Sequence, residues 1–118
     1  MVNTVRKQRE FERREEDILD AALTLFAHPN WESVTIEQIA NLAGIGKGTV
    51  YKHVSSKDEL LFKLTIQFYR GLLQRFQLEN MDSDNVLESF RNIFKIAFQY
   101  HLDHAEYRYI VEYTNRID

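Results

Sequence analysis

The stretch VTIEQIANLAGIGKGTVYKHVSSKDELL, residues 34–61, contains the starts of two helices. Thr35 lies three residues before Gln38, which is the spacing of a capping box at a helix N-terminus. Ser56 lies three residues before Glu59, and an apolar run follows, so the same spacing predicts the start of a long helix. The stretch therefore predicts two capped helices with a connection between them.

The connection between the two capping boxes is rich in glycine. Gly44 suits the end of the first helix, because glycine readily adopts the left-handed conformation that often closes a helix. Residues 44–46 lead into KGTVYKHV, residues 47–54, which we expect to form a further short helix with Val50 pointing inward. A glycine-containing turn between two short helices is typical of a helix-turn-helix arrangement.

The helical period extends over the rest of the chain. In residues 18–26 apolar side chains recur at three- and four-residue steps, and Pro29 is expected to end that helix. Similar apolar stripes predict helices from Ser56 onward, over residues 86–101 and over residues 105–115. No stretch has the alternation of a strand, so the expected fold class is all-α.

Composition argues against several kinds of protein. The chain has 118 residues and no cysteine, so it forms no disulfide and performs no thiol chemistry. It has neither a signal-peptide-like start nor an apolar run of membrane-spanning length, so we expect a soluble, cytoplasmic protein with no membrane partner.

Catalysis and metal binding find little support in the residues present. No grouping of serine, histidine and acid suggests an active site, and no phosphate-binding loop follows a strand, so we expect neither an enzyme nor a cofactor. His101 and His104 are three residues apart and can meet on one helix face, but a metal site needs more ligands than two.

The net charge of −3 hides a local excess of positive charge. Within residues 44–57 the charged side chains are Lys47, Lys52 and Lys57, with His53 beside them and no acid. A surface that binds nucleic acid needs a basic patch of this kind, even when the whole chain is mildly acidic. Three lysines are equally compatible with an ordinary solvated face, so the charge pattern alone leaves both interpretations open.

The side chains of the short helix suit the major groove of DNA. Lysine donates hydrogen bonds to guanine edges or phosphates, and threonine offers both a hydroxyl and a methyl group. We expect Lys47, Thr49, Lys52 and His53 to point outward from the helix-turn-helix.

Neighbouring residues suit contacts with phosphate. Tyr51 can donate a phenolic hydrogen bond, and Gly46 and Gly48 remove side-chain bulk where the backbone would approach DNA. Thr35 and Lys57 lie at helix starts, whose free amides attract anions. This arrangement predicts phosphate contacts on both sides of a helix that reads bases.

Taken together, ILDAALTLFA from Ile18 and the stretch ending at Leu61 closely resemble the amino-terminal DNA-binding domain of the TetR family of transcriptional regulators. The most specific part is residues 48–60, with the pattern G-T-V-Y-x-H-V-x-S-K-D-x-L. The chain departs from the family pattern at Gly46, where a capping serine or threonine is common, and at Val54, where phenylalanine is common. Neither departure removes an expected DNA contact.

The resemblance implies a three-helix head over residues 1–56, of which 1–12 are expected to be flexible. A long fourth helix would join this head to the start of a helical ligand-binding and dimerisation body over residues 57–118, with residues 79–85 as a linker within it. The residues that the resemblance and the pattern together place at DNA are Thr35, Lys47, Gly48, Thr49, Tyr51, Lys52, His53 and Lys57.

The resemblance also implies that the body binds a small-molecule inducer. Weak candidates for lining its pocket are Phe68, Phe94, Phe98, His101 and Tyr107. Ordinary packing between helices accounts for each of these residues as well.

We therefore expect a sequence-specific transcriptional regulator, a repressor that acts as a homodimer and that a ligand releases from a palindromic operator in double-stranded DNA. The alternative is an architectural or partner-binding protein of the same fold with no inducer. A helical enzyme or a pure interaction module is a third reading, and it predicts no salt-sensitive DNA binding. The chain stops within a helical pattern, so we expect it to lack the last helices through which family members pair.

Overall fold

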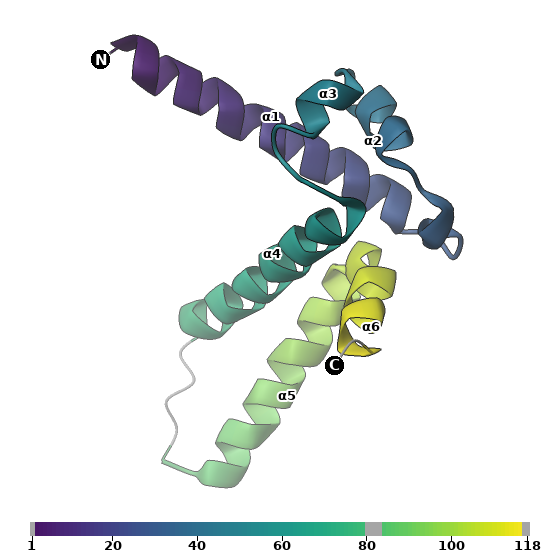
Figure 1. Cartoon of the computed structure of the whole chain (residues 1–118). Helices are drawn as coiled ribbons and strands as arrows, with labels where there is room; N and C mark the ends of the chain where they lie inside the picture. The colour runs from purple at the N-terminus through teal and green to yellow at the C-terminus, as the bar shows by residue number, and fades with distance from the viewer. Residues whose placement is uncertain (1, 80–83, 117–118) are drawn as a thin grey trace.

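The computed structural model describes residues 2–79 and 84–116, and no strand occurs within these ranges. The helices are α1 (Val2–Phe26), α2 (Ile36–Ala43), α3 (Lys47–Val50), α4 (Lys57–Leu78), α5 (Val86–Asp103) and α6 (Arg108–Arg116), with 3-10 turns η1 (Trp31–Ser33) and η2 (Ala105–Tyr107). Figure 1 shows α2 and α3 on one side of α1, and α4, α5 and α6 on the other. The expected all-α fold is confirmed.

The head packs α1, α2 and α3 around a small apolar core. Ile18 and Phe26 of α1, Ile39 of α2 and Val50 of α3 are all fully buried in one cluster. Burial of one such side chain stabilises the fold by about 1.5–3 kcal/mol. The apolar spacing in α1 and α2 therefore determines which of their faces meet, and the core holds the short α3 in place.

Both ends of α2 follow the sequence prediction. Thr35 Oγ1 accepts a hydrogen bond from the amide of Gln38 at 3.2 Å, and Gln38 Oε1 accepts one from the amide of Thr35 at 3.0 Å. Gly44 ends the helix with φ of 74°, in the left-handed region, where a side chain would be strained. These two ends set the angle at which the chain enters α3.

The first half of α1 differs from the prediction. We expect residues 1–12 to be flexible, whereas α1 covers all of them that the structure describes. Arg6 and Glu10 form an ion pair at 3.6 Å, which adds only about 0.2–0.5 kcal/mol. The ring of Phe11 stacks on that of His53, with centroids 4.0 Å apart. This contact with the end of the helix-turn-helix anchors the first half of α1 against the head.

The start of α4 is capped as predicted at one of two points. Ser56 Oγ accepts a hydrogen bond from the amide of Glu59 at 3.2 Å. The Glu59 carboxylate bonds instead to Ser55, accepting from its amide at 2.6 Å and from its hydroxyl at 2.7 Å. The backbone bond and then the hydroxyl bond from Ser55 hold the pKa of Glu59 below its ordinary value, because both favour the charged form.

In the body, α4 and α5 approach each other closely at Gly71. A Cβ atom on Gly71 would collide with the Tyr100 hydroxyl, which donates a hydrogen bond to the Phe68 carbonyl at 2.6 Å. Arg75 lies over the other part of the Tyr100 ring, 5.2 Å from its centroid. Gly71 therefore permits a crossing that any larger residue would open.

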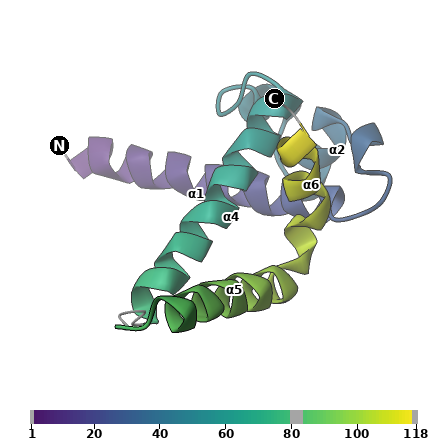
Figure 2. The ribbon, with the colours of Figure 1, turned by 90° about the horizontal axis from the view of Figure 1, so that it is seen from below.

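The hydrophobic core continues from the head into the body. Trp31 is buried and packs on Tyr113 of α6 with ring centroids 4.9 Å apart. Figure 2 shows α6 lying beside α4, and the two helices are in contact. The expected boundary at residue 56 precedes α4 and falls within one continuous core, so the division into two domains stays a prediction.

Two further expectations concern the polar segment and the membrane. The expected linker, residues 79–85, lies mostly outside the described residues. Among the helices that the structure describes, none has the combination of length and apolar character that a membrane span requires.

Candidate nucleic-acid interface

α3 has one buried and one exposed side. Its N-cap is Gly46, which supplies no side-chain hydrogen bond, so this helix end is capped less firmly than that of α2. Val50 is fully buried, Thr49 is half-buried, and Lys47 and Gly48 are exposed. The core thus fixes α3 through Val50 while Lys47 and Gly48 face outward.

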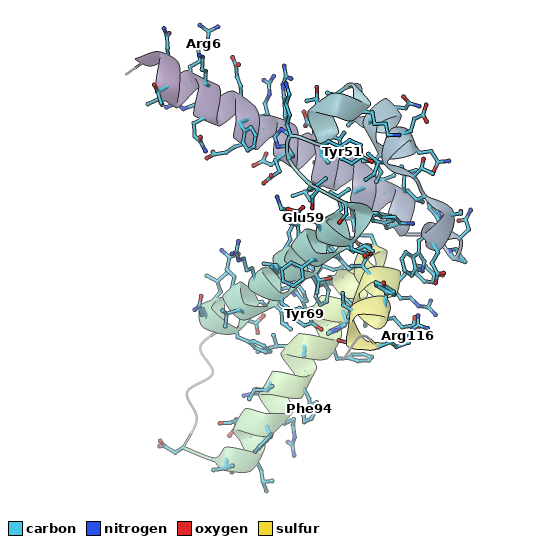
Figure 3. The ribbon with its side chains drawn as sticks, in the orientation of Figure 1. Arg6, Tyr51, Glu59, Tyr69, Phe94 and Arg116 are labelled. Carbon is cyan, nitrogen blue, oxygen red and sulfur yellow. The ribbon has the colours of Figure 1, made fainter. Side chains whose placement is uncertain are left out.

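The turn after α3 continues this exposed surface. The amide of Tyr51 donates to the Lys47 carbonyl, so the backbone stays helical beyond Val50. Tyr51 is 47% exposed, and Figure 3 shows it just past α3. Lys52 is also exposed, and within the described part of the chain neither Lys47 nor Lys52 pairs with a carboxylate or a carbonyl. Their charges are therefore available to an external partner.

Thr35 keeps one hydrogen-bonding function free. Its Oγ1 acts as the acceptor for the amide of Gln38 in the α2 cap. A threonine hydroxyl has one donor besides its lone pairs, so the cap leaves the hydroxyl proton of the exposed Thr35 for an acceptor outside the protein.

His53 lies inside the head, so the prediction that it points outward is wrong. Its side chain is only 2% exposed, with Nδ1 3.5 Å from Glu15 Oε1, and its ring stacks on Phe11. The cause is the helical first half of α1, which places the Phe11 ring against that of His53. His53 Nδ1 has no hydrogen-bond partner in the described structure.

Lys57 has a partner within the protein. Its Nζ donates to the Glu32 carbonyl and lies 5.9 Å from the centroids of both Phe26 and Trp31. Lys57 therefore ties the start of α4 to η1. An ammonium group has three donors, so this bond leaves others for a phosphate.

Lys63 connects the body helix α4 to the end of the helix-turn-helix. Its Nζ lies 3.0 Å from Glu15 Oε1 and donates to the His53 carbonyl at 3.2 Å. One side chain of α4 thus contacts both α1 and the residue that closes the exposed turn.

A groove of about 280 Å³ runs between the first half of α1 and α3. It is lined by Lys7, Glu10, Phe11, Arg14, Thr49, Lys52 and His53. The sequence prediction missed Lys7 and Arg14, because a segment treated as flexible has no defined face. Their spacing of two helical turns is the signal that would have placed them together.

The body contains a pocket of about 540 Å³ between α4, α5 and α6. Of the five candidate ligand-binding residues, the four that line this pocket are Phe68, Phe98, His101 and Tyr107. Phe94 is not among the lining residues, and its side chain is 71% exposed on α5 (Figure 3). The structure thus separates Phe94 from the other four candidates.

His101 lies in α5 and His104 directly follows it. Each ring bonds to a backbone carbonyl four residues earlier in the chain. His101 Nδ1 lies 2.7 Å from the Ala97 carbonyl, and His104 Nδ1 lies 3.0 Å from the Tyr100 carbonyl. No group of three or more histidine, cysteine or acidic side chains within the described ranges is arranged to hold a metal ion.

Comparison with known proteins assigns the head to a family. Residues 18–64 match the family described as bacterial regulatory proteins, tetR family. This match covers the buried face of α1, all of α2 and α3, and the first turns of α4.

Several curated proteins are similar over a longer stretch. An HTH-type transcriptional repressor KstR2 of Mycolicibacterium smegmatis is 29% identical over 86 residues, which are 73% of this chain and 42% of that protein. The KstR2 of Mycobacterium tuberculosis strain H37Rv is 30% identical over 86 residues, 73% of this chain and 43% of that protein. The biofilm operon icaADBC HTH-type negative transcriptional regulator IcaR of Staphylococcus epidermidis is 30% identical over 97 residues, 82% of this chain and 50% of that protein.

The chain spans half or less of the length of these relatives. Their names describe repressors or a negative regulator, and they give no support to the architectural alternative. The matched domain covers the helix-turn-helix whose caps, turn and core are described above. Residues 18–64 therefore form a domain of the tetR family of bacterial regulatory proteins, and the similarity to these repressors supports a regulator of that family.

Proposed function

We propose that this protein is a sequence-specific DNA-binding transcriptional repressor whose operator binding is relieved by a small molecule. The observation that carries the proposal is the exposed side of α3, where Lys47 and Lys52 are unpaired while Val50 is locked in the core. A short helix held rigidly with free cations outward fits the major groove. The names of the relatives support repression over activation.

The residues divide into those that read bases and those that hold phosphate. Lys47, Thr49 and Lys52 extend from α3 and its following turn, and we assign them to base edges. Gly48 is exposed and has no atom near the position of an added Cβ, so its backbone can approach the duplex closely. His53 has no place in this set, because it is buried.

Three other side chains are assigned to phosphates. Thr35 has its hydroxyl proton free beside the start of α2, and Tyr51 has an exposed ring that carries a phenolic donor. Lys57 keeps donors beyond the one bound to Glu32. Phosphate contacts of this kind set the position of the head on DNA but do not select the sequence.

The body pocket is the proposed site of the effector. Its volume of about 540 Å³ is within the range of about 300–1,000 Å³ typical of small-molecule sites. Phe68 and Tyr107 provide apolar surface, while Arg108 and Glu112 provide charge for a polar group of the ligand. Such a lining suits a mostly apolar molecule with one or two polar groups.

A repressor of this kind acts as a homodimer in the bacterial cytoplasm. One head covers one half-site, and two heads related by a two-fold axis read an inverted repeat with half-site centres about 34 Å apart. An effector that moves α4 would alter the head through Lys63, which contacts both Glu15 and the His53 carbonyl.

The proposal is tested by selecting bound sequences from a random DNA pool with the 118-residue chain at two salt concentrations. We expect a recurrent half-site or an inverted repeat, with Lys52→Ala altering the preference at a defined base and Lys95→Ala leaving it unchanged. Lys95 is exposed on α5, so Lys95→Ala removes the same charge at a position away from α3. Salt-sensitive binding without any sequence preference would support the architectural alternative, and no binding at all would refute DNA recognition.

A further inference from the structure

The groove between α1 and α3 concentrates positive charge that the helix-turn-helix does not account for. Residues 2–14 contain five basic side chains, Arg6, Lys7, Arg9, Arg13 and Arg14, against two acidic ones, Glu10 and Glu12. The whole chain, by contrast, has a net charge of −3. The exposed first half of α1 is therefore a basic end on an acidic protein.

Two of these cations meet the recognition side of α3. Lys7 and Arg14 line the same groove as Thr49 and Lys52, with α1 forming one bank and α3 the other. Figure 1 shows the first half of α1 extending beyond α3. The groove is thus continuous with the surface that we assign to DNA.

The cations of the groove are free, whereas the nearby acids are occupied. Within the described residues, Lys7, Arg14 and Lys52 have no ion-pair or hydrogen-bond partner. Glu10, the one acid of the lining, pairs with Arg6 at 3.6 Å. Lys7, Arg14 and Lys52 therefore give the lining of the groove a net positive charge, because Glu10 is the one acid among its residues.

Two stacked rings line the groove between its α1 and α3 sides. Phe11 and His53 stack with centroids 4.0 Å apart and an angle of 19° between their planes, and His53 is buried. This contact joins the two sides of the groove. The site therefore differs from a mobile basic arm, since the helix that carries Lys7 and Arg14 contacts the head before a ligand arrives.

We propose that this groove binds a phosphate of the DNA backbone through Lys7 and Arg14 on its α1 side, while Thr49 and Lys52 on its other side are left to base edges, so that α1 extends the interface beyond the helix-turn-helix. This inference rests on the proposed function. DNA is favoured over a free phosphate because the groove opens onto the surface of α3, where the duplex would lie.

The test measures the affinity of the 118-residue chain for a duplex recovered in the selection, as a function of salt concentration. Each phosphate contact that is lost reduces the slope of log K against log[salt] by about 0.9. We expect Lys7→Ala/Arg14→Ala to lower the magnitude of the slope by about 1–2 and to weaken binding to all sequences alike. The base preference is expected to stay that of the wild type.

The matched control is Arg91→Ala/Lys95→Ala, which removes the same charge from exposed positions on α5. The conservative pair Lys7→Arg/Arg14→Lys is expected to retain the wild-type slope, and circular dichroism melts would verify that each variant is folded. A Lys7→Ala/Arg14→Ala slope equal to that of the α5 control would overturn the groove while leaving DNA binding intact. If inorganic phosphate at constant ionic strength displaced the duplex only from proteins with an intact groove, the site would bind free phosphate instead of the backbone. Failure of the wild type to bind any duplex would refute both this inference and the proposed function.

Discussion

Lys52 and His53 are adjacent in the chain but have different surroundings. Lys52 is exposed and unpaired in the turn after α3, whereas His53 is buried against Phe11 with Glu15 nearby. We therefore assign Lys52 to the proposed DNA contact and His53 to the fold. Two single substitutions separate these roles.

We predict that Lys52→Ala changes discrimination between bases by about 1–3 kcal/mol and leaves the melting temperature unchanged. His53→Ala is predicted to lower the free energy of unfolding by about 2 kcal/mol, because it removes a buried ring and its stacking partner's contact. Thermal denaturation and sequence selection on both variants measure the two effects. A loss of base preference in a fully folded His53→Ala protein would restore the original assignment of His53 to DNA.

Gly48 is a position at which the proposed DNA contact and the stability of α3 favour different residues. It lies within α3 and an added Cβ would meet no atom of the protein. Gly48→Ala is therefore predicted to leave stability unchanged or raise it by up to about 1 kcal/mol, since alanine favours a helix. We expect the same change to weaken DNA binding, because the methyl group occupies space needed for the close approach of the backbone.

Chemical denaturation and a binding titration on the same preparation would check the Gly48→Ala prediction. Equal affinity for DNA in the variant and the wild type would show that the duplex does not come close to this position.

At the scale of elements, the start of α4 depends on a charged carboxylate. The Ser55 amide and hydroxyl hold the pKa of Glu59 below its ordinary value of 4.5. Because the folded-state pKa is the lower one, the stabilisation is present above the unfolded-state pKa and is lost as the pH falls through the folded-state value. The cap therefore weakens only in acid.

We predict that Glu59→Gln lowers the stability of the protein at pH 7 and that the difference from the wild type shrinks below pH ~4. Urea denaturation over this pH range measures it, with Glu16→Gln as a control at an exposed carboxylate of α1. A difference that stays constant with pH would mean that the charge of Glu59 contributes nothing to the cap.

Gly71 lies at the crossing of α4 and α5. Unlike Gly48, it has no room for a side chain. A methyl group on Gly71 would collide with the Tyr100 hydroxyl, which is buried and bonded to the Phe68 carbonyl. Gly71→Ala is predicted to destabilise the body by about 1–3 kcal/mol, in spite of the better helix propensity of alanine. The double variant Gly71→Ala/Tyr100→Phe, which removes the hydroxyl, should recover part of that loss. A stable Gly71→Ala single variant would show that the helices separate there without cost.

The sequence predicts those elements whose ends carry local signals. The Thr35 box, the left-handed Gly44 and the apolar spacing around Ile39 each act within a few residues, so they can be read without a structure. The helix over residues 2–12 could not be read, because its anchor is the tertiary contact of Phe11 with a residue far along the chain. The inward orientation of the His53 ring, next to Lys52, depends on the same contact.

The candidate site was predictable to a similar extent. The composition around Lys47 and Thr49 identified the exposed side of α3, because short helices expose whatever the core does not hold. The groove with Lys7 and Arg14 depends on how α1 lies against α3, which no local pattern specifies. The tie between Lys57 and the Glu32 carbonyl is likewise a product of the packing.

At the scale of the molecule, one continuous core joins the head to the body that contains the pocket. Phe26 of the head and Ile110 of α6 are fully buried in the same cluster, and Lys63 bonds across from α4 to the end of the helix-turn-helix. Close-packed cores transmit displacement because they cannot absorb it. This continuity supports the proposal that occupation of the body pocket beside Phe68 displaces α3.

The central claim is that the side of the head carrying α3 meets DNA, and amide NMR on the labelled 14.1 kDa chain tests it most directly. A duplex recovered in the selection would be titrated into the protein while the backbone amide shifts are followed. The account predicts that the largest changes fall on residues 47–52, on Thr35 and along the first half of α1, with little change over α5. Changes confined to α5 and α6, or their absence at saturating DNA, would contradict it.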